Sequence, residues 1–236
     1  MSVFADLVGR LADLLQPLFG ASAAAAAIVL FTALVRLLVH PLSRAAARGQ
    51  KARTALAPRI AELRRKHGKD PERFQRAVME LHAEEKVSPL SGCLPSLFQL
   101  PAFFLLYHLF SSTSVGGRPN GLLDHALFDA PLGGRLADAL SGGAGGGAVL
   151  VYGALLAVVA VVAAFGHRIA RRAAAARPEP LADGGEQVPG LGAVAKVAPF
   201  MPYFTLVTVA VVPLAAALYV VTSTAWSTVE RAVLHR

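Results

Sequence analysis

The residue with the clearest chemical potential in this chain is Arg36, because it stands alone as a charge inside a strongly hydrophobic segment, residues 21–41. A charged guanidinium at the centre of a lipid bilayer costs about 2.5–3.5 kcal/mol on insertion scales. The side chain must therefore face water, a partner or a polar cavity, where it would attract anionic groups. It could instead extend along the helix to the lipid headgroups, since Pro41 lies only five residues later. Both explanations remain open on this segment alone.

Other residue types that could do chemistry form no recognisable site in the sequence. An intramembrane hydrolase needs a positioned nucleophile and base, but His40, His108, His167 and His235 all lie near the ends of predicted spans, which indicates interfacial anchoring. Cys93, the single cysteine, cannot form an internal disulfide and is expected to be a small packing residue. There is no P-loop sequence. The sequence therefore predicts a protein that is not an enzyme and needs no cofactor or metal.

The composition is that of a membrane protein. Of the 236 residues, 55% are hydrophobic and only 16% are charged, against about 25% charged in soluble domains. Apolar blocks alternate with basic stretches, and the net charge is +8. Nucleic acid is the usual alternative partner for a basic chain, but there is no zinc pattern and no RNA-binding aromatic signature. Orientation in a membrane explains the basic excess without nucleic acid.

We predict an all-α membrane protein with five transmembrane helices. A core of about 30 Å needs about 20 apolar residues per helix, and Pro213 divides the last long apolar stretch into two short spans. The five predicted spans are residues 21–41, 94–110, 148–165, 197–212 and 214–233. Before them, residues 4–19 carry leucines at helical spacing among charges. This pattern predicts an interfacial amphipathic helix within residues 1–20, with a short soluble leader as the alternative.

Basic residues in the loops predict the orientation. Residues 43–87 contain 12 Lys and Arg, whereas residues 111–147, which are rich in glycine, contain two. More arginines follow the third span and the fifth. Since cytoplasmic loops carry the excess of Lys and Arg, the N-terminus should lie outside and the C-terminus in the cytoplasm. Residues 173–195 are predicted to be a flexible cytoplasmic connector.

The basic segment between the first two spans, residues 43–87, is predicted to be a cytoplasmic helical hairpin. Gly68 can end its first helix, and Asp70 followed by Pro71 supplies an N-cap and a first-turn proline for the second. The apolar residues at helical spacing are Leu56, Ile60 and Leu63 in the first helix and Phe74, Val78 and Leu81 in the second. Its charges could be a solvated face and a topology signal, or they could dock anionic headgroups or an incoming chain.

Three stretches of the sequence resemble one known family when they are read in order with the charged hairpin between the first two. They are FTALVRLLVHPLS, SPLSGCLPSLFQLPAFFLLYHLF and APFMPYFTLVTVAVVPLAAALYVVTS, and they resemble the bacterial YidC membrane protein insertases and their mitochondrial and chloroplast relatives. The resemblance covers residues 21–236. One departure is Tyr219–Val220, where the family often has Tyr-Trp.

The resemblance implies a five-span core enclosing a hydrophilic groove that is closed to the outside and open to lipid and cytoplasm. Arg36 matches the family's arginine on the groove wall, and Gln99 would be a second polar groove residue, with an interhelical hydrogen bond as its alternative role. The hairpin would be the mobile part that receives substrates. Its contact residues would be the six apolar ones already named, Leu56, Ile60, Leu63, Phe74, Val78 and Leu81.

The expected function is therefore insertion and assisted folding of small membrane proteins in the bacterial cytoplasmic membrane, alone or with the Sec translocon. The expected partners are newly made membrane proteins, the Sec translocon, the ribosome and anionic lipids, and no nucleic acid. The alternative is a small multi-span transporter that uses Arg36 to bind an anionic solute. Against it, the long hairpin has no obvious transport purpose and inverted repeats are not apparent.

Overall fold

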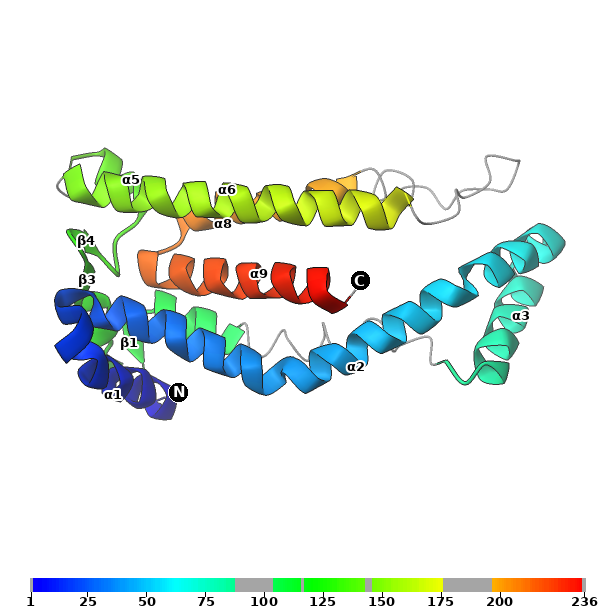
Figure 1. Cartoon of the computed structure of the whole chain (residues 1–236), viewed down its shortest axis with the longest axis horizontal. Helices are drawn as coiled ribbons and strands as arrows, with labels where there is room; N and C mark the ends of the chain where they lie inside the picture. Colours follow the sequence, from blue (N-terminus) through cyan, green and yellow to red (C-terminus); the bar gives the residue numbers. More distant parts are fainter. Residues whose placement is uncertain (1, 88–103, 116, 143–145, 176–196, 235–236) are drawn as a thin grey trace.

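The protein is almost entirely helical in this computed structural model, which describes residues 2–87, 104–115, 117–142, 146–175 and 197–234. The N-terminal part consists of α1 (Ser2–Phe19), η1 (Gly20–Ser22), α2 (Ala23–His67) and α3 (Pro71–Glu84). The long helices α2, α6 (Gly146–Ala175) and α9 (Leu214–Leu234) run along the length of the molecule, and α9 lies between the other two (Figure 1). The predicted all-α class is confirmed.

Helix α2 is longer than the sequence predicted. The first span was expected to end at residue 41, but α2 continues for 45 residues through both Pro41 and Pro58. An internal proline removes one backbone hydrogen bond and bends a helix, and α2 bends along its length without ending (Figure 1). At ~1.5 Å per residue it measures about 68 Å, more than twice a hydrocarbon core of about 30 Å. Its second half must therefore project beyond any membrane that the first half crosses.

Helix α3 begins as the sequence predicts. Asp70 is the N-cap, its carboxylate accepts a hydrogen bond of 3.0 Å from the backbone N–H of Arg73, and Pro71 occupies the first turn. Gly68 is the C-cap of α2. α3 then returns beside the end of α2, and an ion pair between Arg59 and Glu85 joins the two.

The glycine-rich segment after the second predicted span has more structure than a loop. It contains two antiparallel pairs of two-residue strands, β1 (Ser114–Val115) with β2 (Arg118–Pro119) and β3 (Ala126–Leu127) with β4 (Ala130–Pro131). A 3-10 helix, η2 (Gly121–Asp124), separates the two pairs, and α5 (Leu136–Leu140) follows them. These elements gather at one end of the bundle, and α3 lies at the other (Figure 1).

This segment is hydrogen-bonded to the helices beneath it. The first backbone N–H groups of α9, those of Leu214 and Ala215, donate to the carbonyls of Gly134 and Leu132, each at 2.9 Å. The buried Tyr152 hydroxyl donates to the Gly134 carbonyl at 2.5 Å. Asn120 is also buried and donates to the Leu109 carbonyl at 2.7 Å. We call residues 112–115 and 117–142 the end cap, because they close this end of the bundle.

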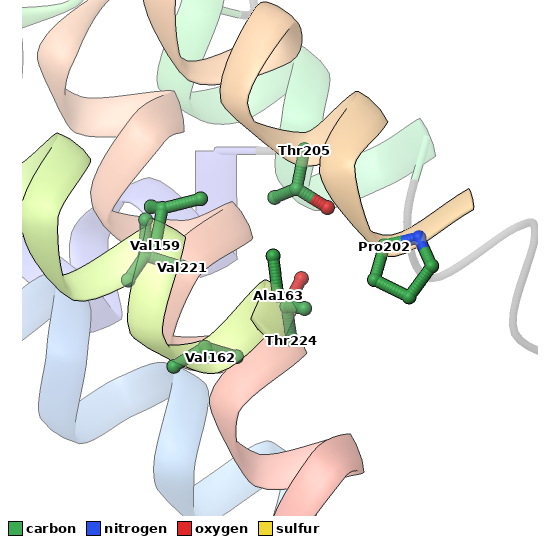
Figure 2. Close-up of a pocket in the computed structure, with 7 residues that line it drawn as sticks. All are labelled: Val159, Val162, Ala163, Pro202, Thr205, Val221 and Thr224. Carbon is green, nitrogen blue, oxygen red and sulfur yellow. The ribbon is translucent and has the colours of Figure 1, made fainter. Parts of the chain in front are cut away.

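The predicted break at Pro213 is confirmed, since α8 (Phe204–Val211) ends just before it and α9 begins just after it. The predicted span 197–212 starts less regularly, with the 3-10 helix η3 (Ala198–Tyr203). Helix α9 forms the centre of the core, because all residues from 214 to 221 are buried. Helices α6, η3, α8 and α9 line a small gap that has no room for a water molecule. Figure 2 shows the side chains around this gap, among them Val159 on α6, Thr205 on α8 and Thr224 on α9.

The five-span count is not established by these helices. Among the described residues, two helical stretches are long and apolar enough to cross a membrane, Phe4–His67 and Gly146–Arg172, and Phe200–Val211 is a shorter apolar one. Of the second predicted span, residues 104–110 are described and are helical. Gln99 and Cys93 lie outside the described residues, as does nearly all of the predicted connector at 173–195.

Candidate functional site

Arg36 points across the interface between α2 and α9. Its Nε lies 3.1 Å from the hydroxyl oxygen of Ser223, and a second guanidinium nitrogen donates to the same oxygen. Ser223 is buried and Arg36 is half-buried. The guanidinium therefore has a hydrogen-bond partner on α9 and lies in the interface between the two helices. It does not extend along α2 toward the headgroups.

Tyr219 lies one turn before Ser223 on α9 and completes the surroundings of the arginine. Its side chain is buried and hydrogen-bonded to Ser223, and it lies within electrostatic reach of Arg36. The tyrosine ring packs against Phe110, with ring centroids 6.0 Å apart and planes tilted by 43°. The tyrosine of the family's Tyr-Trp is thus kept at Tyr219 and makes an aromatic contact, whereas Val220, where the family often has Trp, is a buried aliphatic residue.

A second polar pair lies one helical turn further along α2. His40 Nδ1 is 2.6 Å from Glu230 Oε1, and the glutamate side chain is only 11% exposed. Glu230 is also within electrostatic reach of Arg36. We call Arg36, His40, Tyr219, Ser223 and Glu230 the polar seam.

The charge of Arg36 is not neutralised by contact within the polar seam. Its hydrogen-bond acceptor is a neutral hydroxyl, whereas the nearby carboxylate of Glu230 is engaged by His40. Among the residues that the structure describes, no carboxylate forms a direct ion pair with Arg36. The seam thus presents a positive charge that remains able to attract an anionic group.

Comparison with known proteins decides the family of this chain. A family model described as "60Kd inner membrane protein" matches residues 14–236. The chain belongs to this family. The resemblance to YidC-type insertases read from the sequence is confirmed, and so is the expectation that the chain is not an enzyme, because its relatives are named for membrane insertion.

Several curated relatives carry the name membrane protein insertase YidC. The one from Laribacter hongkongensis is 48% identical over 81 residues, which cover 34% of this chain and 15% of the relative. The one from Magnetococcus marinus is 43% identical over 94 residues, covering 39% and 17%. The one from Clostridium perfringens is 43% identical over 84 residues, covering 36% and 35%. The chain therefore matches no more than about a third of the length of these relatives.

The six apolar residues predicted to receive substrate in this family member lie where α2 and α3 meet. Leu56 on α2 and Leu81 on α3 are buried, at 5% and 6% exposed. The other four, Ile60, Leu63, Phe74 and Val78, are partly buried. The largest exposed apolar side chain on α3 is instead Met79, at 58%. In this conformation Leu56 and Leu81 are covered where α2 packs beside α3, so a substrate could reach them only after the structure around them opened.

Sequence reasoning missed the α9 half of the polar seam. Tyr219, Ser223, Ser227 and Glu230 are spaced by four, four and three residues, which places them on one face of a helix. In an otherwise apolar span, that stripe was the available signal. Ser227 hydrogen-bonds within its own helix, to the Ser223 carbonyl at 2.9 Å. Only the fold shows that the stripe faces Arg36.

Proposed function

We propose that this protein is a membrane protein insertase that helps small membrane proteins move short polar segments across the bacterial cytoplasmic membrane. Membership of the 60Kd inner membrane protein family supports this proposal. The observation that carries the mechanism is the half-buried guanidinium of Arg36, which is held by a neutral hydroxyl across the α2–α9 interface.

The physical task is to lower the cost of taking a polar segment out of water, because unpaired polar groups in hydrocarbon cost several kcal/mol each. In the proposed mechanism a hydrated groove beside the polar seam keeps part of that hydration, while the hydrophobic segment of the substrate leaves sideways into lipid. Arg36 attracts acidic residues of the translocating tail. Two charges 4 Å apart attract by about 4 kcal/mol at an effective dielectric of 20, against about 1 kcal/mol in water.

The end cap supports a groove that is closed on the outer side. Ala130 and Leu132 in the cap are fully buried, and the cap carbonyls accept hydrogen bonds from the start of α9. The other end of the molecule carries α3 and the projecting half of α2. In this proposal that end lies in the cytoplasm, as the basic residues predict, and α1 lies in the outer interface.

The same proposal assigns α2 and α3 the task of receiving substrates at the cytoplasmic face, with Gln99 as a second polar groove residue. The chain would act alone or beside the Sec translocon, with the ribosome and anionic lipids as further partners. It uses no cofactor and no nucleic acid. The small transporter is not proposed, because no contact in the polar seam favours a free solute over an acidic peptide.

Protease protection of a small single-span substrate with an acidic N-terminal tail tests the proposal, in Sec-free liposomes containing the full chain. The parent should protect the tail, Arg36→Ala should lose most of that protection, and Arg36→Lys should retain more of it because the charge is kept. Arg44→Ala is the matched control, since Arg44 is exposed two turns further along α2. Equal protection by parent and Arg36→Ala would refute the role of the arginine. Protection by none of the proteins would refute autonomous insertion.

A further inference from the structure

A second feature of the bundle lies away from the polar seam, beneath the end cap. It is an apolar cleft of about 490 Å³ between the first half of α6, the start of α9 and the turn between β3 and β4. Leu150, Ala154 and Val158 line it from α6, Leu214 and Leu218 from α9, and Phe128 from the turn. Its other lining residues are also apolar. A volume of 300–1,000 Å³ is typical of sites for one small molecule.

The position of the cleft on α6 indicates which medium fills it. The cleft lies within Gly146–Arg172, a stretch long and apolar enough to span a membrane. Its lining on α6 extends from Gly147 to Val158, which is about 16 Å at ~1.5 Å per residue. Half of a hydrocarbon core of about 30 Å is about 15 Å. On an α6 that spans a membrane, a cleft of this length matches the depth of one leaflet, and its open side would face hydrocarbon.

The volume of the cleft excludes the larger apolar occupants. A ~16 Å length of α-helix about 10 Å wide occupies about 1,300 Å³, well above the 490 Å³ of the cleft. A transmembrane helix of a substrate or of a second copy therefore does not fit inside. A single unbranched hydrocarbon chain does fit.

Phe128 at the mouth of the cleft has an unusual backbone. It is the first residue of the two-residue loop between β3 and β4, and its φ is +52°. Glycine normally takes this position in such loops, because a bulky residue at positive φ is strained. Its side chain is nevertheless 74% exposed. Strain of this kind gathers at ligand sites, and here it keeps a phenyl ring at the entrance to an apolar cleft.

We propose that this cleft is a binding site for one acyl chain of a phospholipid from the leaflet in which α6 begins. The hydrophobic effect does not drive this binding, because lipid tails are as apolar as the lining. The gain comes from dispersion contacts on three sides of the chain. The bound lipid fills the gap between α6 and α9 under the end cap, so it would be retained when bulk lipid is removed.

Native mass spectrometry of the full chain tests the proposal, after purification in a mild detergent with added palmitoyl-oleoyl-phosphatidylglycerol. The parent should retain one lipid per chain. Ala154→Trp, which fills the cleft, should lower the retained fraction at least fivefold. Ala157→Trp is the matched control. Ala157 lies three residues after Ala154 on α6 and is also exposed, but it does not line the cleft. The control should retain lipid like the parent.

Phe128→Gly is a second variant, in which lipid binding should change without a loss of stability. Glycine relieves the backbone strain, so the melting temperature should not fall, whereas lipid retention should fall because one wall of the mouth is lost. Equal retention by the parent, Ala154→Trp and Phe128→Gly would overturn the proposal. A dimer that dissociates on Ala154→Trp would also overturn it, because the occupant would then be a second copy of the chain.

Discussion

Replacing Ser223 with alanine keeps the charge of Arg36 but removes the hydroxyl that holds it in place. The variant therefore tests whether the placement of the charge matters. The substitution removes one oxygen and leaves both N–H donors of Arg36 without the acceptor that they share. A hydrogen bond to a charged group contributes about 1.5–3 kcal/mol in soluble proteins, whereas polar contacts between transmembrane helices average about 0.6 and reach about 1.7 kcal/mol. Because Arg36 is only half-buried and can turn toward water, we expect Ser223→Ala to lower the free energy of unfolding by about 1.5 kcal/mol.

Unfolding by sodium dodecyl sulfate in mixed micelles measures this loss. Ser227→Ala is the matched control, because its hydroxyl bonds only within α9 and its removal should cost less than about 0.5 kcal/mol. A double-mutant cycle with Arg36→Met isolates the coupling between the two side chains. Equal losses for Ser223→Ala and Ser227→Ala, with no coupling to Arg36→Met, would refute the hydrogen-bonded seam.

The same variant makes a prediction for function. Ser223→Ala keeps the guanidinium, so protection of an acidic tail should persist in the liposome assay, whereas Arg36→Ala should abolish most of it. If Ser223→Ala abolished protection while the protein remained folded, placement of the charge by α9 would matter more than the charge alone. That result would refute the attraction mechanism as we state it.

Three further substitutions, one of them with a matched control, test the contacts that hold the rest of the chain in place. Asp70→Ala removes the N-cap of α3 and should cost about 1 kcal/mol of local stability, seen as faster hydrogen exchange in the first turn of α3. Tyr152→Phe removes the hydroxyl bonded to the Gly134 carbonyl and should cost about 1 kcal/mol in the unfolding assay, with faster exchange in the end cap. Leu81→Ala, at a buried site, should make the α2–α3 pair cleavable by protease, whereas Met79→Ala, at an exposed site, should not.

Local chemistry made several parts of this fold predictable from the sequence. Asp70 and Pro71 mark the start of α3 because a side-chain cap and a first-turn proline act within one turn. Pro213 divides two helices for a similar reason: it lacks an N–H and lies between two apolar runs too long for one span. Arg36 stood out because charge in lipid is costly wherever the helix goes. Each of these signals depends on neighbours in sequence.

One miss is local, and the others involve contacts between residues far apart in sequence. Pro41 has the same local chemistry as Pro213, yet α2 continues through it, because a proline also bends a helix without ending it. The end cap looked like a glycine-rich loop, since the carbonyls of Leu132 and Gly134 accept from backbone N–H groups of α9, about 80 residues away in sequence. The sequence alone does not show that Ser223 lies beside Arg36, because this contact forms only when α9 packs against α2. Tertiary hydrogen bonds of this kind leave almost no trace in local composition.

The two ends of the bundle have different roles in the proposed mechanism. At the end cap, backbone hydrogen bonds and buried side chains satisfy the polar groups, so a polar segment gains nothing by entering there. Further along, α9 carries hydroxyls and a carboxylate toward α2, and the positive charge of Arg36 meets no carboxylate directly within the described residues. A segment that enters from the α3 end therefore meets the charge before it meets the closed cap. On that geometry, insertion should favour short acidic tails, and neutralising the acidic residues of the tail should lower its protection in the liposome assay as Arg36→Ala does.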